Sequence, residues 1–447
     1  MPSFKASCIL LWIAFTSPKT WYKQSNAFVN ASEEEELANQ LTLTLKNEVK
    51  IPLIALGLGE VETNVIPDII SIAAREDVGY DLIDTDHESK NEEIISESFM
   101  NENRKDVEMI TKVWYTHLGY ERTKISIKES LFNVREHVKI HMLLHWPRCD
   151  DEIEWMNCQK EEDELPSHVQ KAGPSPLQNP YGEDAAWKGS WKAMEEMYVE
   201  NDQIVSIGVS NFLPDDMVEL VDEVANIGPH LYQGHIVQRF LQPDLIRILA
   251  DHDIAFQAYH VMRGVFSKID ERPWARHHLE RIALDLSRQD DIISWPRLVL
   301  GFLTQHNVAV TVRATQEQHI YENSPMSIRN IPKLNEAQSQ EMTEIIETIL
   351  QDKDVPEPSE EDKMHLLMRI PLKATFHNKL KDTPVDVFWV NEDTGERVSV
   401  GSDFEPGGSY GLHTYRGHKF VAESKDGRSF DFIVRKDVHE ENFSIEL

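Results

Sequence analysis

The sequence predicts an α/β protein: a (β/α)8 barrel of the TIM type, followed by a small all-β sandwich domain. Between residues 41 and 350, eight short apolar runs alternate with eight amphipathic segments of helical period, as expected for parallel strands joined by helices. After residue 364 the apolar period changes to two, and turns of Gly, Asp and Asn separate the runs, which indicates β-strands. Residues 351–363 are acidic and contain two prolines, so we expect a linker there.

The predicted barrel begins with a two-stranded ribbon over residues 41–51, which would close its bottom. The stretch from Gly79 to Glu93 is central, because an apolar run places Asp84 at the carboxyl end of a strand, where barrels carry their chemistry. The predicted strands are 54–57, 82–84, 107–113, 140–145, 204–209, 231–233, 254–259 and 308–312. The predicted helices are 66–77, one from 92, 122–136, 185–200, 214–225, 243–251, 292–306 and 316–323, with a further helix over 334–350.

Two stretches of the barrel region show no period. Residues 148–184 are polar and contain proline, and a connection of that length without structure of its own is usually a lid or a disordered loop. Residues 260–290 also look irregular. In the C-terminal domain, residues 364–447, we expect about six strands: 366–370, 385–390, 397–400, 413–415, 419–422 and 430–434.

Size and charge restrict the classes of partner. A chain of 447 residues suits one large domain and a smaller one, and 40% hydrophobic and 27% charged residues are ordinary for folded proteins. The net charge of -32, from 77 acidic and 45 basic residues, argues against nucleic acid or an anionic membrane surface as a partner.

The N-terminus, residues 1–27, has the outline of a signal peptide. Lys5 precedes a short apolar run over residues 8–15, and small residues follow at Ser25, Ala27 and Ala31. The run is too short to span a bilayer. The Ala27-Phe28 junction also resembles the cleavage junction of plastid presequences in algae with complex plastids. We therefore expect the secretory pathway (endoplasmic reticulum or secreted) first, a plastid second and the cytoplasm third.

Cys149 and Cys158 both lie in the polar stretch 148–184. They could form a disulfide in an oxidising compartment, or remain as two free surface thiols. No spacing of Cys and His resembles a zinc motif, so we expect no metal site.

The stretch that contains Asp84 resembles the aldo-keto reductase family, whose second strand carries its catalytic Asp as Gly-Tyr-x-x-Ile-Asp, here residues 79–84. Thr-Lys-Val-Trp places Lys112, and Leu-Leu-His-Trp-Pro places His145, at the family's catalytic Lys and His positions. The resemblance covers residues 41–350 and implies hydride transfer from a nicotinamide to a carbonyl. The family's catalytic Tyr lies five residues after the Asp, and here that position is Ser89.

Ser89 is a poor replacement for the family's proton-donating Tyr, because its hydroxyl is less acidic and its side chain is shorter. His87, Tyr115 or a water held by Ser89 could donate the proton instead. Each residue also has a plain structural interpretation: Asp84 could cap a helix, Lys112 could form a salt bridge, and His145 could be a core histidine. Several matches in the right order on successive strand ends favour the catalytic interpretation.

The same resemblance implies a cofactor site for NADP(H), with NAD(H) as the alternative. Gly-Val-Ser-Asn-Phe at 208–212 is similar to the family's motif for the nicotinamide carboxamide, and the loop 260–264 departs from the family's Ser-Pro-Leu-Gly. The implied carboxamide and ring contacts are Ser210, Asn211, Gln233 and Tyr259. The implied contacts to the 2'-phosphate and adenine are Arg313, His319, Glu322 and Asn323.

Residues 385–423 resemble the β domain of the von Hippel-Lindau tumour suppressor, most specifically in His-Thr-Tyr-Arg-Gly-His at 413–418. That resemblance implies a hydroxyproline pocket formed by His413, Thr414, His418 and Phe420. The helical domain that recruits ligase machinery is absent, so ubiquitin transfer is not implied. The alternative is a β sandwich used only for docking.

Two hypotheses follow from these patterns. In the first, the chain is an NADP-preferring oxidoreductase that reduces an unknown aldehyde or ketone, with an incomplete catalytic set. In the second, it is a pseudoenzyme whose barrel holds a nicotinamide nucleotide while the β domain binds a hydroxyproline-containing or other protein ligand.

Overall fold

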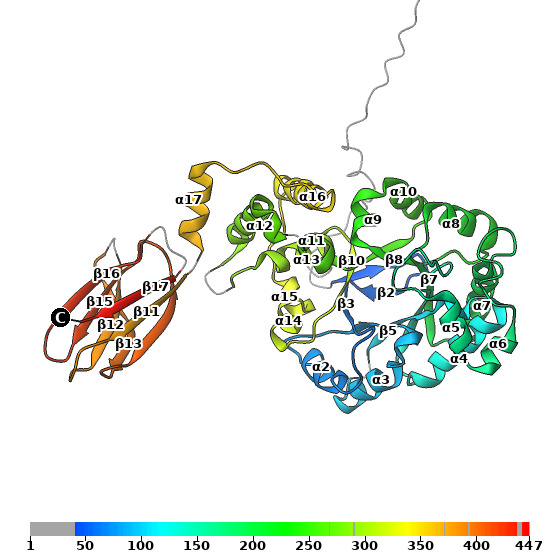
Figure 1. Cartoon of the computed structure of the whole chain (residues 1–447), viewed down its shortest axis with the longest axis horizontal. Coiled ribbons are helices and arrows are strands. Elements are labelled where there is room, and N and C mark those ends of the chain that lie inside the picture. Colours follow the sequence, from blue (N-terminus) through cyan, green and yellow to red (C-terminus); the bar gives the residue numbers. More distant parts are fainter. Residues whose placement is uncertain are drawn as a thin grey trace, which may run out of the picture. The chain divides into compact units, whose positions relative to one another are not determined.

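The computed structural model describes residues 41–104, 106–267, 269–288, 291–370, 372–391, 394–435 and 440–446 (Figure 1). The predicted signal peptide, residues 1–27, lies outside the described residues. Among those that are described, no helix has both the length and the apolar character that crossing a bilayer requires.

Eight parallel strands close into a barrel in the order β10-β3-β4-β5-β6-β7-β8-β9, which confirms the predicted fold class. All eight strands lie within about two residues of their predicted positions. Their bounds are β3 Ile54–Gly57, β4 Leu82–Asp84, β5 Glu108–Val113, β6 Lys139–Leu144, β7 Ile204–Ser210, β8 Leu231–His235, β9 Ala255–Tyr259 and β10 Ala309–Val312.

The predicted ribbon is also present, as β1 (Thr42–Thr44) paired antiparallel with β2 (Lys50–Pro52). Leu45 and Ile51 of this segment are buried and belong to one apolar cluster with Leu82 and Leu143 from the barrel strands. The ribbon therefore covers apolar side chains inside the barrel that water would otherwise reach.

Helices surround the barrel strands (Figure 1), and they begin where the sequence carries start signals. Ser294 accepts a hydrogen bond from the backbone N–H of Arg297 and proline follows in the first turn of α13. Asn335 and Gln338 form a capping box at the start of α16. The predicted helices correspond to α2 Ile66–Ala73, α3 Glu92–Asn101, α4 Tyr120–Asn133, α7 Ala186–Glu200, α8 Pro214–Glu219 with the π-helical η4 Leu220–Val224, α10 Pro243–Asp251, α13 Trp295–Gln305, α14 Glu317–Glu322 and α16 Glu336–Leu350; α9 Ile236–Leu241 and α15 Pro325–Arg329 were not predicted.

The stretch 148–184 contains structure that the sequence did not predict. It forms α5 (Cys158–Glu164) and α6 (Ser167–Ala172), and a disulfide joins Cys149 to Cys158. Arg122, only 2% exposed, donates from both terminal nitrogens to the carboxylate of Glu162 at 2.9 Å. The expectation of a structureless connection was wrong because partners distant in the sequence hold helices that are too short for a visible period.

Residues 260–290 also contain helices, namely α11 (Val261–Phe266), the 3-10 turn η5 (Ile269–Glu271) and α12 (Pro273–Leu286). In α12, Ala275, Leu279, Ile282 and Ala283 are buried, which is helical spacing. The prediction of an irregular stretch was wrong because polar and charged residues separate these apolar positions.

The C-terminal part forms two sheets, in the orders β14-β11-β17 and β13-β12-β15-β16. Apolar residues from both sheets share one core, with the ring of Phe376 at 5.0–5.2 Å from the rings of Phe443 and Phe420. The strands are β11 Leu372–Asn378, β12 Val385–Val390, β13 Arg397–Phe404, β14 Ser409–Thr414, β15 Lys419–Ser424, β16 Ser429–Ile433 and β17 Glu440–Ile445.

The sequence missed β11 and β17 and misplaced one strand. The predicted strand 366–370 lies in a helix, α17 (Glu360–Arg369), which begins inside the predicted linker. The side chain of Ser359 accepts a hydrogen bond from the N–H of Asp362 and three acidic residues follow in the first turn, so the acidic composition stabilises a helix start.

Candidate active site

A buried ion pair lies at the carboxyl ends of β4 and β5. Lys112 Nζ donates to Asp84 Oδ1 and to the backbone oxygen of Thr85, both at 2.7 Å. Asp84 is 8% exposed and Lys112 4%. Asp84 also accepts hydrogen bonds from Gln233 Nε2 at 2.9 Å and from Thr311 Oγ1 at 3.1 Å. The strand ends thus place a fixed positive charge, with its counter-ion, in a site with little water.

His145 follows β6 and lies beside this pair. Its backbone oxygen accepts a hydrogen bond from Asn211 Nδ2 at 3.0 Å, and its ring lies edge-on to the ring of Trp114, with centroids 4.9 Å apart. Burial, together with the positive charge of Lys112, lowers the pKa of His145 to about 3. The imidazole is therefore neutral at neutral pH and can offer one N–H donor. Its Nδ1 is buried without a hydrogen-bond partner among the described residues.

Ser89 lies at the end of the short turn η2 (His87–Ser89), where its hydroxyl forms hydrogen bonds with Asp86 and Glu60. Ser89 Oγ donates to Asp86 Oδ1 at 2.9 Å and accepts from the N–H of Glu60 at 2.9 Å. Burial would raise the pKa of Asp86, but the positive charge of Lys112 and the hydrogen bonds from Ser89 lower it overall. Sequence reasoning missed Asp86; its position two residues beyond Asp84, past the same strand end, was the available signal.

The two other side chains proposed as proton donors are hydrogen-bonded to glutamates. His87 Nε2 lies 2.8 Å from Glu129 Oε2. The hydroxyl of Tyr115 donates to Glu161 of α5, which also accepts from Trp114 Nε1 at 2.9 Å. Helix α5 of the inserted stretch therefore contacts aromatic residues that follow β5.

Three of the predicted cofactor residues form a hydrogen-bonded group at the ends of β7 and β9. The hydroxyl of Tyr259 donates to Asn211 Oδ1 at 2.7 Å, and Asn211 Nδ2 lies 3.1 Å from Ser210 Oγ. Asn211 has a φ of 60°, a left-handed conformation that Asn tolerates better than most residues. Burial raises the pKa of Tyr259 to about 12.

Gln233 faces the ion pair and does not join this group. Its Nε2 donates to Asp84 and to Gln257 Oε1, the latter at 2.8 Å. Gln257, which sequence reasoning also missed, has a buried Nε2 without a partner among the described residues. The side chains around Asp84 therefore form one polar network inside the barrel.

The predicted phosphate and adenine residues lie at the end of β10 and on α14, near the surface. Arg313 is exposed and donates to the backbone oxygen of Glu60 at 3.2 Å. His319 is exposed, Glu322 accepts a hydrogen bond from Gln318, and Asn323 caps the end of α14. The loop 260–264 begins with His260 at a φ of 55° and continues into α11.

In the β domain, two of the four predicted ligand residues are in contact. Thr414 Oγ1 lies 2.9 Å from His418 Nδ1. His413 is exposed, and adjacent residues of a strand point to opposite faces, so it lies away from the buried Thr414. Phe420 is 1% exposed and packs against Phe376 in the core. The ring of Phe420 is therefore used between the sheets.

Comparison with known proteins identifies the barrel. The profile of the Aldo/keto reductase family matches residues 68–347, which is more than half of the chain. The chain belongs to the aldo/keto reductase family. Its similarity to solved aldo/keto reductase structures shows the fold: the enzyme from Brucella melitensis has a TM-score of 0.51 at 22% identity, over 68% of this chain and 98% of that one.

Two reductases are similar to this chain in sequence. Glyoxal reductase of Bacillus subtilis is 26% identical over 293 residues, 63% of this chain and 86% of its own length. The 9,11-endoperoxide prostaglandin H2 reductase of Trypanosoma cruzi is 24% identical over 310 residues, 67% of this chain and 93% of its own length. These relatives support a general oxidoreductase function.

Proposed function

We propose that the barrel is an NAD(P)H-dependent oxidoreductase that reduces an aldehyde or ketone, with slow turnover because Ser89 stands at the position of the acid. The observation that carries this proposal is the buried Lys112–Asp84 pair beside the neutral ring of His145. Bound NAD(P)H would supply the hydride to the carbonyl carbon. The N–H of His145 would orient the carbonyl oxygen, and the charge of Lys112 would stabilise the negative charge that develops on it.

The polar groups at the strand ends fit a nicotinamide. Ser210 and Asn211 offer a hydroxyl and an amide at the end of β7, and the half-buried ring of Tyr259 offers a flat face beside them. The exposed Arg313 and His319 would face the 2'-phosphate of NADP(H), which supports a preference for that cofactor.

The proton that completes the alcohol would come from water held at Ser89, because His87 and Tyr115 are hydrogen-bonded to glutamates. Hydride addition would form a new C–H bond, and proton transfer from that water to the alkoxide oxygen would leave hydroxide at Ser89, which solvent would protonate again. A positioned general acid typically contributes about 10²–10⁴ in rate, so we expect turnover slower by a factor of that size than with a Tyr in place.

The test has two steps. NADPH is titrated into the purified full chain and followed by Trp fluorescence, and then aldehydes and ketones are assayed with the natural protein and with Ser89→Tyr. Asp86→Ala combined with Ser89→Tyr is a second variant, because Asp86 accepts hydrogen bonds from Ser89 and holds this turn. Lys112→Met in the Ser89→Tyr background is the control that should abolish any gain.

Binding with slow turnover, increased by Ser89→Tyr, would support the proposal. Binding without turnover until Tyr is restored would support the alternative, a nucleotide-holding pseudoenzyme. Absence of NADPH and NADH binding would refute both.

We propose a second function for the β domain, which resembles the von Hippel-Lindau β domain: binding of a hydroxyproline-containing peptide. The contact between Thr414 Oγ1 and His418 Nδ1 supports it, because the buried Thr414 could orient the half-buried imidazole of His418 toward a ligand hydroxyl. The rings of Trp389 and Tyr415 lie 5.5 and 5.4 Å from that of His418 and offer apolar surface. Equal affinity for a hydroxyproline peptide and its proline counterpart would refute this function, and Thr414→Val should reduce the preference.

We also propose entry into the secretory pathway. The disulfide between Cys149 and Cys158 supports it, since such bonds persist in oxidising compartments. Thiol labelling after expression in eukaryotic cells should find both cysteines oxidised and the protein in the microsomal fraction or medium; plastid import of a tagged chain would contradict the proposal.

A further inference from the structure

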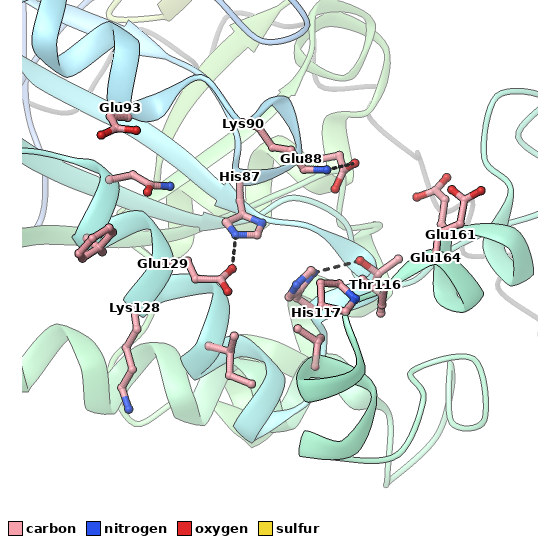
Figure 2. A pocket seen from close by; sticks show the side chains of 16 residues that line it. His87, Glu88, Lys90, Glu93, Thr116, His117, Lys128, Glu129, Glu161 and Glu164 are labelled. Atoms are coloured by element: carbon pink, nitrogen blue, oxygen red, sulfur yellow. Dashed lines mark hydrogen bonds and ion pairs between the residues drawn. The ribbon is translucent and has the colours of Figure 1, made fainter.

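Figure 2 shows the side chains that line a cavity of about 660 Å³. Its walls come from η2, from α3, from η3 (Tyr115–His117), from α4 and from the inserted helices α5 and α6. Five carboxylates and only two ammonium groups line it: Glu88, Glu93, Glu129, Glu161 and Glu164 against Lys90 and Lys128. The surplus of negative charge favours a cation in this cavity.

Three side chains on the wall have donor atoms that converge. One ligand atom each from His87, His117 and Glu129 lies within 4.8 Å of the others. His87 Nε2 is 2.8 Å from Glu129 Oε2, and the rings of His87 and His117 are 5.0 Å apart at 68°. Figure 2 shows the three side chains approaching the same space from three different elements. His117 and Glu129 follow His87 by 30 and 42 positions in the sequence. This spacing resembles no zinc motif, so only the fold brings the three residues together.

A neighbouring hydroxyl holds the imidazole of His117 in place before any ligand arrives. His117 is 4% exposed, and its Nδ1 lies 3.0 Å from Thr116 Oγ1. If Nδ1 of His117 donates a hydrogen bond to that hydroxyl, the lone pair of the ring lies on Nε2 and faces the cavity. Metal-binding histidines are usually oriented by a neighbouring group in this way. His87 has a buried Nδ1 without a partner among the described residues. A hydrogen bond to Glu129 alone therefore leaves the polar atoms of His87 incompletely satisfied.

We propose that His87, His117 and Glu129 bind a divalent transition-metal ion, Zn²⁺ in particular. Two imidazoles and one carboxylate form a recognised three-ligand set for zinc, with a fourth position open to water. Zinc bonds of about 2.0–2.1 Å place tetrahedral donor atoms roughly 3.4 Å apart, so side-chain movements of about 1 Å would close the site. The ion would replace the proton between His87 and Glu129.

The bound ion would connect η2, η3 and α4. Because η2 also carries Ser89, metal binding would hold the turn that borders the candidate active site. His168 of α6 lies with Nε2 3.5 Å from Glu129 Oε1, but its side chain is 61% exposed. His168 is therefore placed beside the ligands and not among them.

The test uses the full chain after treatment with a chelator. Zn²⁺ is titrated by calorimetry and in competition with a chromogenic chelator, and Co²⁺ absorption reports the ligand geometry. We expect one tight site, and at a free Zn²⁺ concentration 100 times Kd a rise in Tm of about 5 °C. Glu129→Gln, which keeps the shape of the side chain, and His117→Gln should each weaken binding by at least about tenfold, and Thr116→Val by about 10–100-fold.

Two controls separate this site from adventitious binding, since the chain contains 19 histidines. His137→Ala removes an exposed histidine and should leave affinity unchanged, and His168→Ala should change it less than threefold. Circular dichroism checks that each variant folds. Unchanged affinity in Glu129→Gln and His117→Gln, or no binding by the natural chain, would overturn the proposal. The outcome does not depend on carbonyl reduction, because metal binding is measured without cofactor or substrate.

Discussion

The ion pair between Lys112 and Asp84 allows a quantitative test of how the polar centre of the barrel is held. Lys112→Met keeps much of the side-chain volume but removes the charge and both hydrogen bonds at 2.7 Å. Breaking a buried pair by removing one partner costs about 3–5 kcal/mol, because the other charge remains buried. Asp84 keeps hydrogen bonds from Gln233 and Thr311, so we expect a loss near the lower limit, about 3 kcal/mol.

The assay is urea unfolding at pH 7, followed by tryptophan fluorescence, to which the buried Trp187 and Trp191 of α7 contribute. Lys112→Met, Asp84→Asn and the double variant are compared with the natural chain. The double variant contains no uncompensated charge. Its loss in free energy of unfolding should therefore be smaller than the sum of the two single losses by at least about 1 kcal/mol. Additive losses within about 0.5 kcal/mol would refute the description of a desolvated pair.

Three further predictions concern other parts of the chain. The pKa of His145 is lowered from 6.5 to about 3 in the folded chain, so between these pH values the unfolded chain binds a proton at this imidazole more readily than the folded chain does. The contribution of the neutral His145 to the free energy of unfolding is therefore complete above about pH 6.5 and is lost as the pH falls toward 3. His145→Gln should flatten that part of a curve of stability against pH. Replacing Cys149 and Cys158 by Ser removes a loop constraint worth about 2–3 kcal/mol, so limited proteolysis within residues 148–184 should be faster while the far-ultraviolet spectrum is nearly unchanged. Phe376→Ala should destabilise the β domain by about 3–5 kcal/mol, seen as an earlier transition of Trp389 fluorescence, because the ring fills the core between the two sheets; an unchanged transition would contradict that packing.

The barrel was predictable because its signal is repeated. Each strand is a short apolar run, each main helix has an amphipathic period, and eight repeats in order leave few other architectures. Helix N-caps such as Ser294 and Asn335 form hydrogen bonds within one turn, so the neighbouring sequence is enough to predict them. For the same reason, local pattern alone suffices to place Asp84 and Lys112 at strand ends.

Where the sequence failed, long-range contacts decide the structure. Helix α5 is held by the disulfide and by Arg122, which is about 40 residues away in the chain. Strands β11 and β17 pair in parallel although about 65 residues separate Lys373 from its partner Glu440. Residues 366–370 have strand-like composition, yet the cap at Ser359 and the acidic first turn place most of them in α17.

The site divides in the same way. The sequence by itself determined the family, the barrel and the residue types at the strand ends, because these depend on local pattern. Only the tertiary structure showed that Asp86 binds Ser89, that Phe420 belongs to the core and that His87, His117 and Glu129 meet at one cavity. Each of these facts depends on distances between side chains from separate elements, and those distances are fixed by packing of the whole fold.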